Sequence, residues 1–212
     1  RSSRRRPRAG SRPRGVLLGA YGLLADQLGC RWYTPDKEKI PTLRELKLPK
    51  NLAVQKTPVF EYRGTDWHEA MDPTWAARNR ENAVAPLTTI HGGAMVFRPF
   101  VHTFNQIADP EADFAEHPEY FSLVNGQRLK DKTQLCLTNP EVLARAIAKA
   151  REWAAAAGGA NIMSISQNDW ENPCECPGCK AIDEREGSHA GTMIAFVNQV
   201  AEAIEKDYPQ AA

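Results

Sequence analysis

Three cysteines lie close together in the sequence, at Cys174, Cys176 and Cys179, in a CxCxxC arrangement. Thiolates at this spacing are typical of zinc sites, and a structural zinc ion takes four ligands. The candidates for the fourth ligand are His189, Cys136, Cys30 and a residue beyond position 212. A disulfide between two of the three cysteines and plain reduced thiols are the alternatives. The sequence therefore makes a structural zinc ion a candidate, and no cofactor is expected to be required for catalysis.

Two polar clusters each contain a tryptophan and follow a segment of strand-like sequence. The first, RGTDWH, runs from Arg63 to His68, and the second, SQNDWE, runs from Ser166 to Glu171. In parallel α/β architectures, functional groups gather where the carboxyl ends of strands meet. Hydrogen-bonding groups beside an aromatic face are the mixture that a sugar site needs. In the alternative interpretation, the aspartates cap turns and the tryptophans pack under loops.

Asp169, in the second cluster, is the candidate catalytic residue. Glycoside hydrolysis needs a carboxyl group that protonates the leaving oxygen, with a second carboxylate or a substrate group on the other side. Glu171 follows two residues later, but the sequence does not define its orientation relative to Asp169. The candidate substrate-binding residues are Arg63, Trp67, His68, His91, His102, Asn168 and Trp170. For the three histidines, a packed or surface role is the alternative.

The elements that must position these residues alternate between strand and helix patterns. Strand-like segments cover residues 59–63, 134–138 and 161–166. Helix patterns begin with a cap and a proline at Asp72-Pro73 and Asn139-Pro140, and a third begins near Gly191. We expect the second helix to end at Gly158-Gly159 and the third to carry an apolar stripe of Met193, Val197, Val200 and Ile204. Asn125 and Gly126 lie between β-prone arms, which predicts a tight hairpin. Strands that alternate with helices indicate a parallel sheet with helical crossovers. A complete (β/α)₈ barrel takes about 250 residues, so residues 58–212 are expected to form its N-terminal half.

The residues before this region are expected to belong to a different domain. A helical pattern from Gly15 to Gly29 and a proline-containing connection predict that residues 15–57 form the C-terminal part of an accessory α/β domain and a linker. Residues 1–14 contain seven arginines and no apolar periodicity, so we expect a disordered basic arm. A signal sequence and an RNA-binding arm are the alternatives for this start.

Composition excludes several classes of protein. With 42% apolar residues in 212, the chain can bury a sizeable core. A net charge of +1 does not favour nucleic acid as a partner. No basic stripe with interleaved aromatics surrounds the cysteines, so a small nucleic-acid module is disfavoured. No run approaches the roughly 20 apolar residues of a membrane span, so no membrane partner is expected.

Several longer motifs together resemble the bacterial family called domain of unknown function 4838. They occur in the expected order between Gly15 and about Gln210. The motifs are GVLLGAYGLLADQLGCRWYTP, FEYRGTDW, WAARNREN, HPEYFSLVNGQR, QLCLTNPEV, SISQNDWENPCECPGCKAID and FVNQVAEAIEKDYP. The family more distantly resembles α-glucuronidases of glycoside hydrolase family 67 and β-hexosaminidases of family 20. In these enzymes an α/β domain that ends in a helix precedes a catalytic barrel.

This resemblance implies an α/β fold, namely the first four or so βα units of an incomplete TIM-type barrel, preceded by the C-terminal helix of an accessory α/β domain. The missing C-terminal half of the barrel would then be a partner of this fragment, which is expected to be inactive alone. The implied function is that of a glycoside hydrolase-like protein acting on polysaccharide or oligosaccharide, secreted or periplasmic. A non-catalytic carbohydrate-binding or structural barrel is the alternative.

The resemblance also bears on individual residues. Family-20 enzymes carry a sugar-binding arginine on the first barrel strand, and the position of Arg63 resembles it. They also carry an acidic pair after the fourth strand, where this chain has Asn168 and Asp169. With asparagine in the first position, Asp169 alone would serve as the acid. Substrate-assisted chemistry by an acetamido group, which needs the first acid, is therefore in doubt for this chain.

Overall fold

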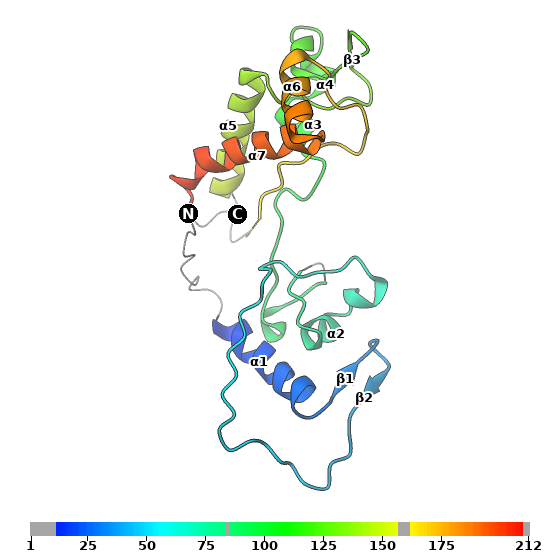
Figure 1. Cartoon of the computed structure of the whole chain (residues 1–212), viewed down its shortest axis with the longest axis vertical. Coiled ribbons are helices and arrows are strands. Elements are labelled where there is room, and N and C mark those ends of the chain that lie inside the picture. Colours follow the sequence, from blue (N-terminus) through cyan, green and yellow to red (C-terminus); the bar gives the residue numbers. More distant parts are fainter. Residues whose placement is uncertain (1–11, 84, 157–161, 210–212) are drawn as a thin grey trace. The chain divides into compact units, whose positions relative to one another are not determined.

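The computed structural model describes residues 12–83, 85–156 and 162–209. The chain divides into two compact units, Arg1–Val96 and Phe97–Ala212, and each is described by itself (Figure 1). The predicted domain boundary near residue 58 lies inside the first unit. The predicted basic arm falls largely on residues 1–11, outside the described residues. Within the described ranges, no helix combines the length and the apolar character that crossing a bilayer requires.

The first unit begins with the predicted helix, α1, which spans Arg12–Asp26. The helix therefore starts three residues before Gly15, where the helical pattern was predicted to begin. Arg14, in its first turn, donates a hydrogen bond from Nε to the carbonyl of Gly92, 2.9 Å away. Gly29, at the predicted end of the helical pattern, has the left-handed backbone (φ 74°) that favours glycine. The other elements are β1 (Arg31–Trp32), β2 (Glu38–Lys39), α2 (Pro73–Arg78) and two 3₁₀ turns, His68–Met71 and Thr89–His91.

Trp32 organises one part of this unit. Its side chain is buried, and its ring packs edge-on against Tyr21 of α1, with the centroids 5.6 Å apart. Its carbonyl accepts hydrogen bonds from Trp75 Nε1 and Asn79 Nδ2, both at 3.1 Å. Helix α2, whose predicted N-cap Asp72 accepts from the backbone N–H of Trp75, is thereby joined to the β1–β2 hairpin.

Asn82 organises the other part. Its buried amide accepts from the backbone N–H of Arg63 at 2.8 Å and donates to the carbonyl of Glu61 at 2.7 Å. Its backbone N–H also donates to the carbonyl of Arg63. Residues 59–63, predicted to form the first barrel strand, have no assigned strand, and Val59 and Phe60 are exposed. A side-chain amide thus supplies hydrogen bonds to this segment that a neighbouring strand would otherwise supply.

The second unit consists mainly of helices (Figure 1). They are α3 (Phe104–Ile107), α4 (Pro110–Asp113), a 3₁₀ turn (Pro118–Tyr120), α5 (Pro140–Ala156), α6 (Pro177–Glu186) and α7 (Ala190–Glu205). The hairpin β3 (Leu123–Val124) to β4 (Gln127–Arg128) confirms the prediction from Asn125 and Gly126, which both have positive φ. The starts predicted for α5 and α7 are confirmed to within one residue. The glycines predicted to end α5 lie outside the described residues.

The core of this unit forms where α5 and α7 pack against each other and α3 packs against α5. Helix α7 buries one residue per turn: Thr192, Phe196, Val200 and Ile204. The predicted stripe on this helix contained Met193 and Val197 and omitted Phe196. Phe196 is fully buried and packs edge-on against Phe104, with the ring centroids 6.3 Å apart. The prediction is therefore correct at Val200 and Ile204, whereas in the first half of the helix Thr192 and Phe196 are buried and the predicted Met193 and Val197 are only partly buried.

Two segments far apart in sequence run side by side and parallel, residues 97–103 and 162–166. A parallel bridge joins Phe97 to Ile162, and backbone N–H groups of Arg98 and Thr103 donate to the carbonyls of Ile162 and Ser166. The predicted strand at 134–138 pairs antiparallel with Phe121 through Leu135 alone. Neither predicted segment is assigned as a strand, because each has only one bridge. The half barrel stays a prediction from the sequence.

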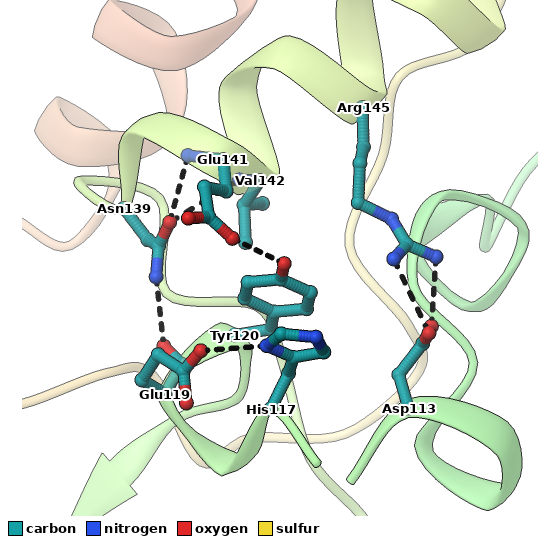
Figure 2. A network of polar contacts seen from close by, with 8 residues as sticks. All are labelled: Asp113, His117, Glu119, Tyr120, Asn139, Glu141, Val142 and Arg145. Atoms are coloured by element: carbon teal, nitrogen blue, oxygen red, sulfur yellow. Dashed lines mark hydrogen bonds and ion pairs between the residues drawn. The ribbon is translucent and has the colours of Figure 1, made fainter.

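A network of polar contacts surrounds Tyr120 and fixes the start of α5 (Figure 2). The buried Tyr120 donates its hydroxyl hydrogen bond to the carboxylate of Glu141 and stacks its ring on His117, with the centroids 4.6 Å apart. The hydrogen bond to Glu141 raises the pKa of Tyr120. Arg145 forms an ion pair of 2.8 Å with Asp113. The network therefore connects α5 with α4 and the 3₁₀ turn.

We expect Tyr120→Phe to lower the free energy of unfolding by about 1–2 kcal/mol, because the ring stays packed while the hydrogen bond to a charged acceptor is lost. Thermal unfolding followed by circular dichroism measures the change. Tyr33→Phe is the matched control, because Tyr33 is exposed and its hydroxyl removal should leave the melting temperature unchanged. Equal melting temperatures for the Tyr120→Phe and wild-type chains would contradict the expectation.

Candidate metal centre and polar rim

Four cysteines of the second unit form one buried cluster, hereafter the cysteine cluster: Cys136, Cys174, Cys176 and Cys179. Their sulfur atoms all lie within 4.8 Å of one another, and the sulfurs of Cys136 and Cys176 are 3.5 Å apart. The exposed fraction of each residue is between 2% and 7%. Each of the five cysteines of the chain is a free thiol. The three cysteines of the CxCxxC motif therefore come together in the structure, and no disulfide joins any two of them.

The structure brings one of the candidate fourth ligands to the CxCxxC motif. Cys136 joins the cluster, whereas Cys30 is buried in the first unit beside Ala25 and Trp32. His189 instead directs Nδ1 to the carboxylate of Asp183, 2.6 Å away. In the sequence Cys136 was one of several candidates for the fourth ligand, and its approach to the other three sulfurs distinguishes it.

The thiols of the cluster influence one another's ionisation. Interactions with the thiols of Cys174 and Cys179 hold the pKa of Cys136 far below the usual thiol value. The same interaction with Cys136 raises the pKa of Cys174 to about 11, and it also raises the pKa of Cys179. One thiolate is thus stabilised by its neighbours, which then resist ionisation themselves because like charges would be adjacent.

In the second predicted cluster, Ser166 to Glu171, a buried side chain from another part of the unit holds the backbone of Asn168. Gln134 accepts from the backbone N–H of Asn168 at 2.9 Å and donates to the carbonyl of Asn168 at 2.8 Å. Asn168 is itself buried, and its amide donates to Asn105 Oδ1 at 2.7 Å and to the carbonyl of Thr133 at 3.2 Å. Asn168, a predicted sugar contact, therefore positions the loop from within.

His102 lies beside the same loop. Its backbone is left-handed (φ 57°), a conformation that is costly for a residue with a side chain. The backbone N–H of His102 donates to Ser166 Oγ at 3.0 Å, and Nδ1 lies 3.1 Å from the carbonyl of Gln167. Because a carbonyl can only accept, Nδ1 carries the proton and Nε2 is left as an acceptor in the neutral ring. We call residues 102–105 and 166–171 the polar rim.

Asp169 and Trp170 are two of the exposed members of the polar rim. Trp170 is 47% exposed, and Lys132 Nζ lies 5.7 Å from the centroid of its ring. Asp169 is exposed as well. A cavity of about 220 Å³ adjoins the loop, and its lining includes Gln167, Glu171, Cys174, Cys179 and His189. The rim thus joins an exposed aromatic ring and carboxylates to a concave surface.

The remaining predicted site residues belong to the first unit. Arg63 directs its guanidinium to backbone carbonyls, with Nε 3.0 Å from that of Arg80 and Nη1 2.9 Å from that of Phe60. His91 Nδ1 accepts from the backbone N–H of Thr88, within a capping box of the turn Thr89–His91. Trp67 and His68 are exposed. Arg63 and His91 thus have structural contacts, and His102, Asn168, Asp169 and Trp170 are the predicted residues that one unit brings together.

A second group of potential ligands, His117, Glu119 and Glu141, also lies within 4.8 Å. These groups already bind protein partners, since His117 lies 3.0 Å from Glu119 and Glu141 accepts from Tyr120 (Figure 2). The glutamates are exposed, so the group fits the polar network of the fold better than a metal site.

A comparison with protein family models identifies the family of the chain. Residues 32–212 match the family model described as Domain of unknown function (DUF4838). The chain belongs to this family. The match includes both the cysteine cluster and the polar rim of the DUF4838 chain. No curated protein and no solved structure matched the chain in the corresponding searches.

Several residues that build the site escaped the sequence analysis. Gln134, Asn105 and Thr103 act through contacts with residues more than 30 positions away. Gln134 opens the motif QLCLTNPEV, but the motif does not reveal its contact with Asn168, and Asn105 and Thr103 belong to none of the quoted motifs. Asp183 escaped it too. This buried carboxylate accepts from the hydroxyl and backbone N–H of Thr192 and from His189, and so joins α6 to α7. In the sequence, the signals for Asp183 are its place at the end of the motif SISQNDWENPCECPGCKAID and the position of Thr192 at the start of a helix.

Asp183 gives a pH-dependent prediction. Burial opposes ionisation, but hydrogen bonds from Thr192 and His189 outweigh it and lower the pKa of Asp183 below its usual value. A carboxylate with a depressed folded-state pKa stabilises the fold above its unfolded pKa of about 3.9, and this stabilisation is lost as the pH falls through the folded value. Asp183→Asn should lower the unfolding free energy at neutral pH by about 1–3 kcal/mol and weaken its decline in acid.

Urea denaturation at several pH values between about 3 and 7 measures both effects. The control is Glu184→Gln on the same helix, because Glu184 is exposed and its nearest cation, Lys180, is 3.9 Å away. An Asp183→Asn chain with the wild-type urea midpoint at neutral pH would show that the carboxylate does not join the helices.

Proposed function

We propose that the polar rim binds carbohydrate, and that the full-length DUF4838 protein is a glycoside hydrolase acting on polysaccharide or oligosaccharide, with Asp169 as general acid. One observation carries the proposal. His102, in a left-handed conformation, and the loop with Asp169 and Trp170 are held against each other across more than 60 residues of sequence. Costly backbone conformations of this kind concentrate at functional sites.

The exposed groups suit a sugar. An exposed tryptophan ring can stack on the C–H face of a pyranose, while a carboxylate accepts and a neutral imidazole accepts or donates hydrogen bonds to hydroxyl groups. Trp170, Asp169 and Nε2 of His102 provide these three kinds of contact in one unit.

The loop is also held in place before a ligand binds. Gln134 and Asn168 fix its backbone through buried hydrogen bonds, so little conformational freedom remains to be lost on binding. The amide of Asn168 already binds Asn105 and Thr133, and it therefore acts as a positioning group instead of a sugar contact.

The acid role depends on the bound ligand. A general acid delivers a proton to the leaving oxygen from a site shielded from water. A sugar stacked on Trp170 would exclude water from the neighbouring Asp169. Asp169 can therefore gain the properties of a general acid in the complex, and it orients hydroxyl groups in the non-catalytic alternative, a carbohydrate-binding barrel.

Binding can be tested by affinity electrophoresis in gels that contain xylan, laminarin or hyaluronan, as plant, algal and host polysaccharides. We expect at least one of them to retard the chain. Trp170→Ala should weaken the retardation by up to about tenfold, since an aromatic contact contributes about 0.5–1.5 kcal/mol. Tyr33→Ala is the matched control, because Tyr33 is an exposed aromatic residue outside the rim.

Retardation that Trp170→Ala leaves unchanged would place carbohydrate binding elsewhere, and no retardation by any polysaccharide would count against the proposal. Turnover tests the acid role separately in the full-length protein. Asp169→Asn should reduce turnover by orders of magnitude for an aryl glycoside with a poor leaving group and only slightly for an activated one. Equal losses would reject the acid role, and binding without turnover would favour the non-catalytic alternative.

A further inference from the structure

The cysteine cluster has the geometry of a metal site, and we infer that Cys136, Cys174, Cys176 and Cys179 bind one Zn²⁺ ion as a Cys₄ structural site. The inference does not depend on the proposed carbohydrate function. It assigns a purpose to the CxCxxC motif, and it identifies Cys136 as the fourth ligand, which the sequence left open among several residues.

The distances fit a single ion. Zinc binds thiolate sulfur at about 2.3 Å, so the sulfurs of a tetrahedral site are about 3.8 Å apart. All four sulfurs lie within 4.8 Å of one another, with Cys136 and Cys176 at 3.5 Å. An iron–sulfur cube inserts several iron atoms between its thiolates and needs a wider spacing. The exclusively sulfur ligand set and the complete coordination fit a structural ion without an open position.

Separate parts of the fold deliver the four ligands. Cys136 follows Leu135, whose bridge to Phe121 fixes this segment. Cys174 and its neighbour Glu175 dock on β3, where the backbone N–H of Glu175 donates to the carbonyl of Leu123 at 2.7 Å. Cys176 is the N-cap of α6, and Cys179 lies in the first turn of that helix. The metal would thus join the hairpin, the segment before α5 and the start of α6.

Gly178 permits the close approach of α6 to the opposite segment. A Cβ atom at this position would lie 2.8 Å from the hydroxyl oxygen of Thr138. The same hydroxyl lies 3.4 Å from the sulfur of Cys176 and 3.3 Å from that of Cys179. Thr138 can therefore donate to a coordinated thiolate, as residues behind metal ligands commonly do.

The surroundings also suit the charge of the site. Four thiolates and one Zn²⁺ ion carry a net charge of −2. The guanidinium of Arg128 lies 3.8 Å from the sulfur of Cys174, and the backbone N–H of Leu123 lies 3.4 Å from the same sulfur. Cys176 and Cys179 occupy the N-terminal end of α6, where the helix dipole favours negative charge. A purely apolar cluster of reduced thiols would need none of these donors.

Metal content is measured directly on the 212-residue chain, purified without chelator, by native mass spectrometry and by elemental analysis. We expect one zinc ion per chain, lost on acid denaturation. Replacement by Co²⁺ should give the intense thiolate charge-transfer absorption and the d–d bands of a tetrahedral sulfur site. A chain without metal, a disulfide-linked pair within the cluster, or the visible absorption of an iron–sulfur cluster would overturn the inference.

Serine variants identify the ligands. Cys136→Ser and Cys176→Ser should each reduce zinc content at equilibrium with a competing chelator by at least tenfold. Cys30→Ser is the matched control, because Cys30 is a buried free thiol of the other unit, and it should retain zinc fully. If Cys136→Ser retained zinc like the control, Cys136 would not be the fourth ligand.

If a ligand variant fails to fold, a thiol titration of the Cys30→Ser chain still tests whether four thiols bind the zinc ion. Titration with a mercurial thiol reagent should modify four thiols for each zinc ion released, detected with a colorimetric zinc indicator. Release of zinc after fewer than four thiols, or modification of four thiols with no zinc released, would contradict the Cys₄ site.

Discussion

The side-chain amide of Gln134 is the contact on which the second unit depends most. It donates to the carbonyl of Asn168 and accepts from the N–H of the same residue, as a neighbouring strand would do. The two segments that it joins are 34 residues apart and lack a ladder of their own at this point. A buried amide that meets both backbone groups replaces the missing ladder, and removing either partner would leave buried polar groups unsatisfied.

The two residues after Gln134 serve different purposes because successive side chains of an extended segment point in opposite directions. Leu135 is buried in the apolar core, and Cys136 enters the cysteine cluster. A chain segment of three residues thereby reaches the polar rim, the core and the proposed metal site. The rim and the cysteine cluster are also joined along the sequence, because Glu171 and Cys174 are separated by two residues and line the same cavity.

The first unit uses its polar residues in a similar way. Asn82 holds the segment that contains Arg63, and the guanidinium of Arg63 binds carbonyls of its own surroundings. An arginine that follows a strand-like segment resembles a ligand-binding residue in the sequence, yet here its donors satisfy backbone acceptors. Asn168 in the second unit also resembles a ligand-binding residue in the sequence, yet its amide donates to Asn105 and to the carbonyl of Thr133. In both places, residues near a predicted site support the backbone of that site.

The sequence by itself determined the local elements. Asn125-Gly126 defined a hairpin because both residues tolerate positive φ, and Asp72-Pro73 and Asn139-Pro140 defined helix starts because they combine a cap with a preset φ. The motifs indicated the DUF4838 family, and the match over residues 32–212 bears this out. Only the tertiary structure selected Cys136 among the candidate fourth ligands, placed Phe196 in the core and revealed Gln134, because these depend on contacts between distant segments that no local pattern records.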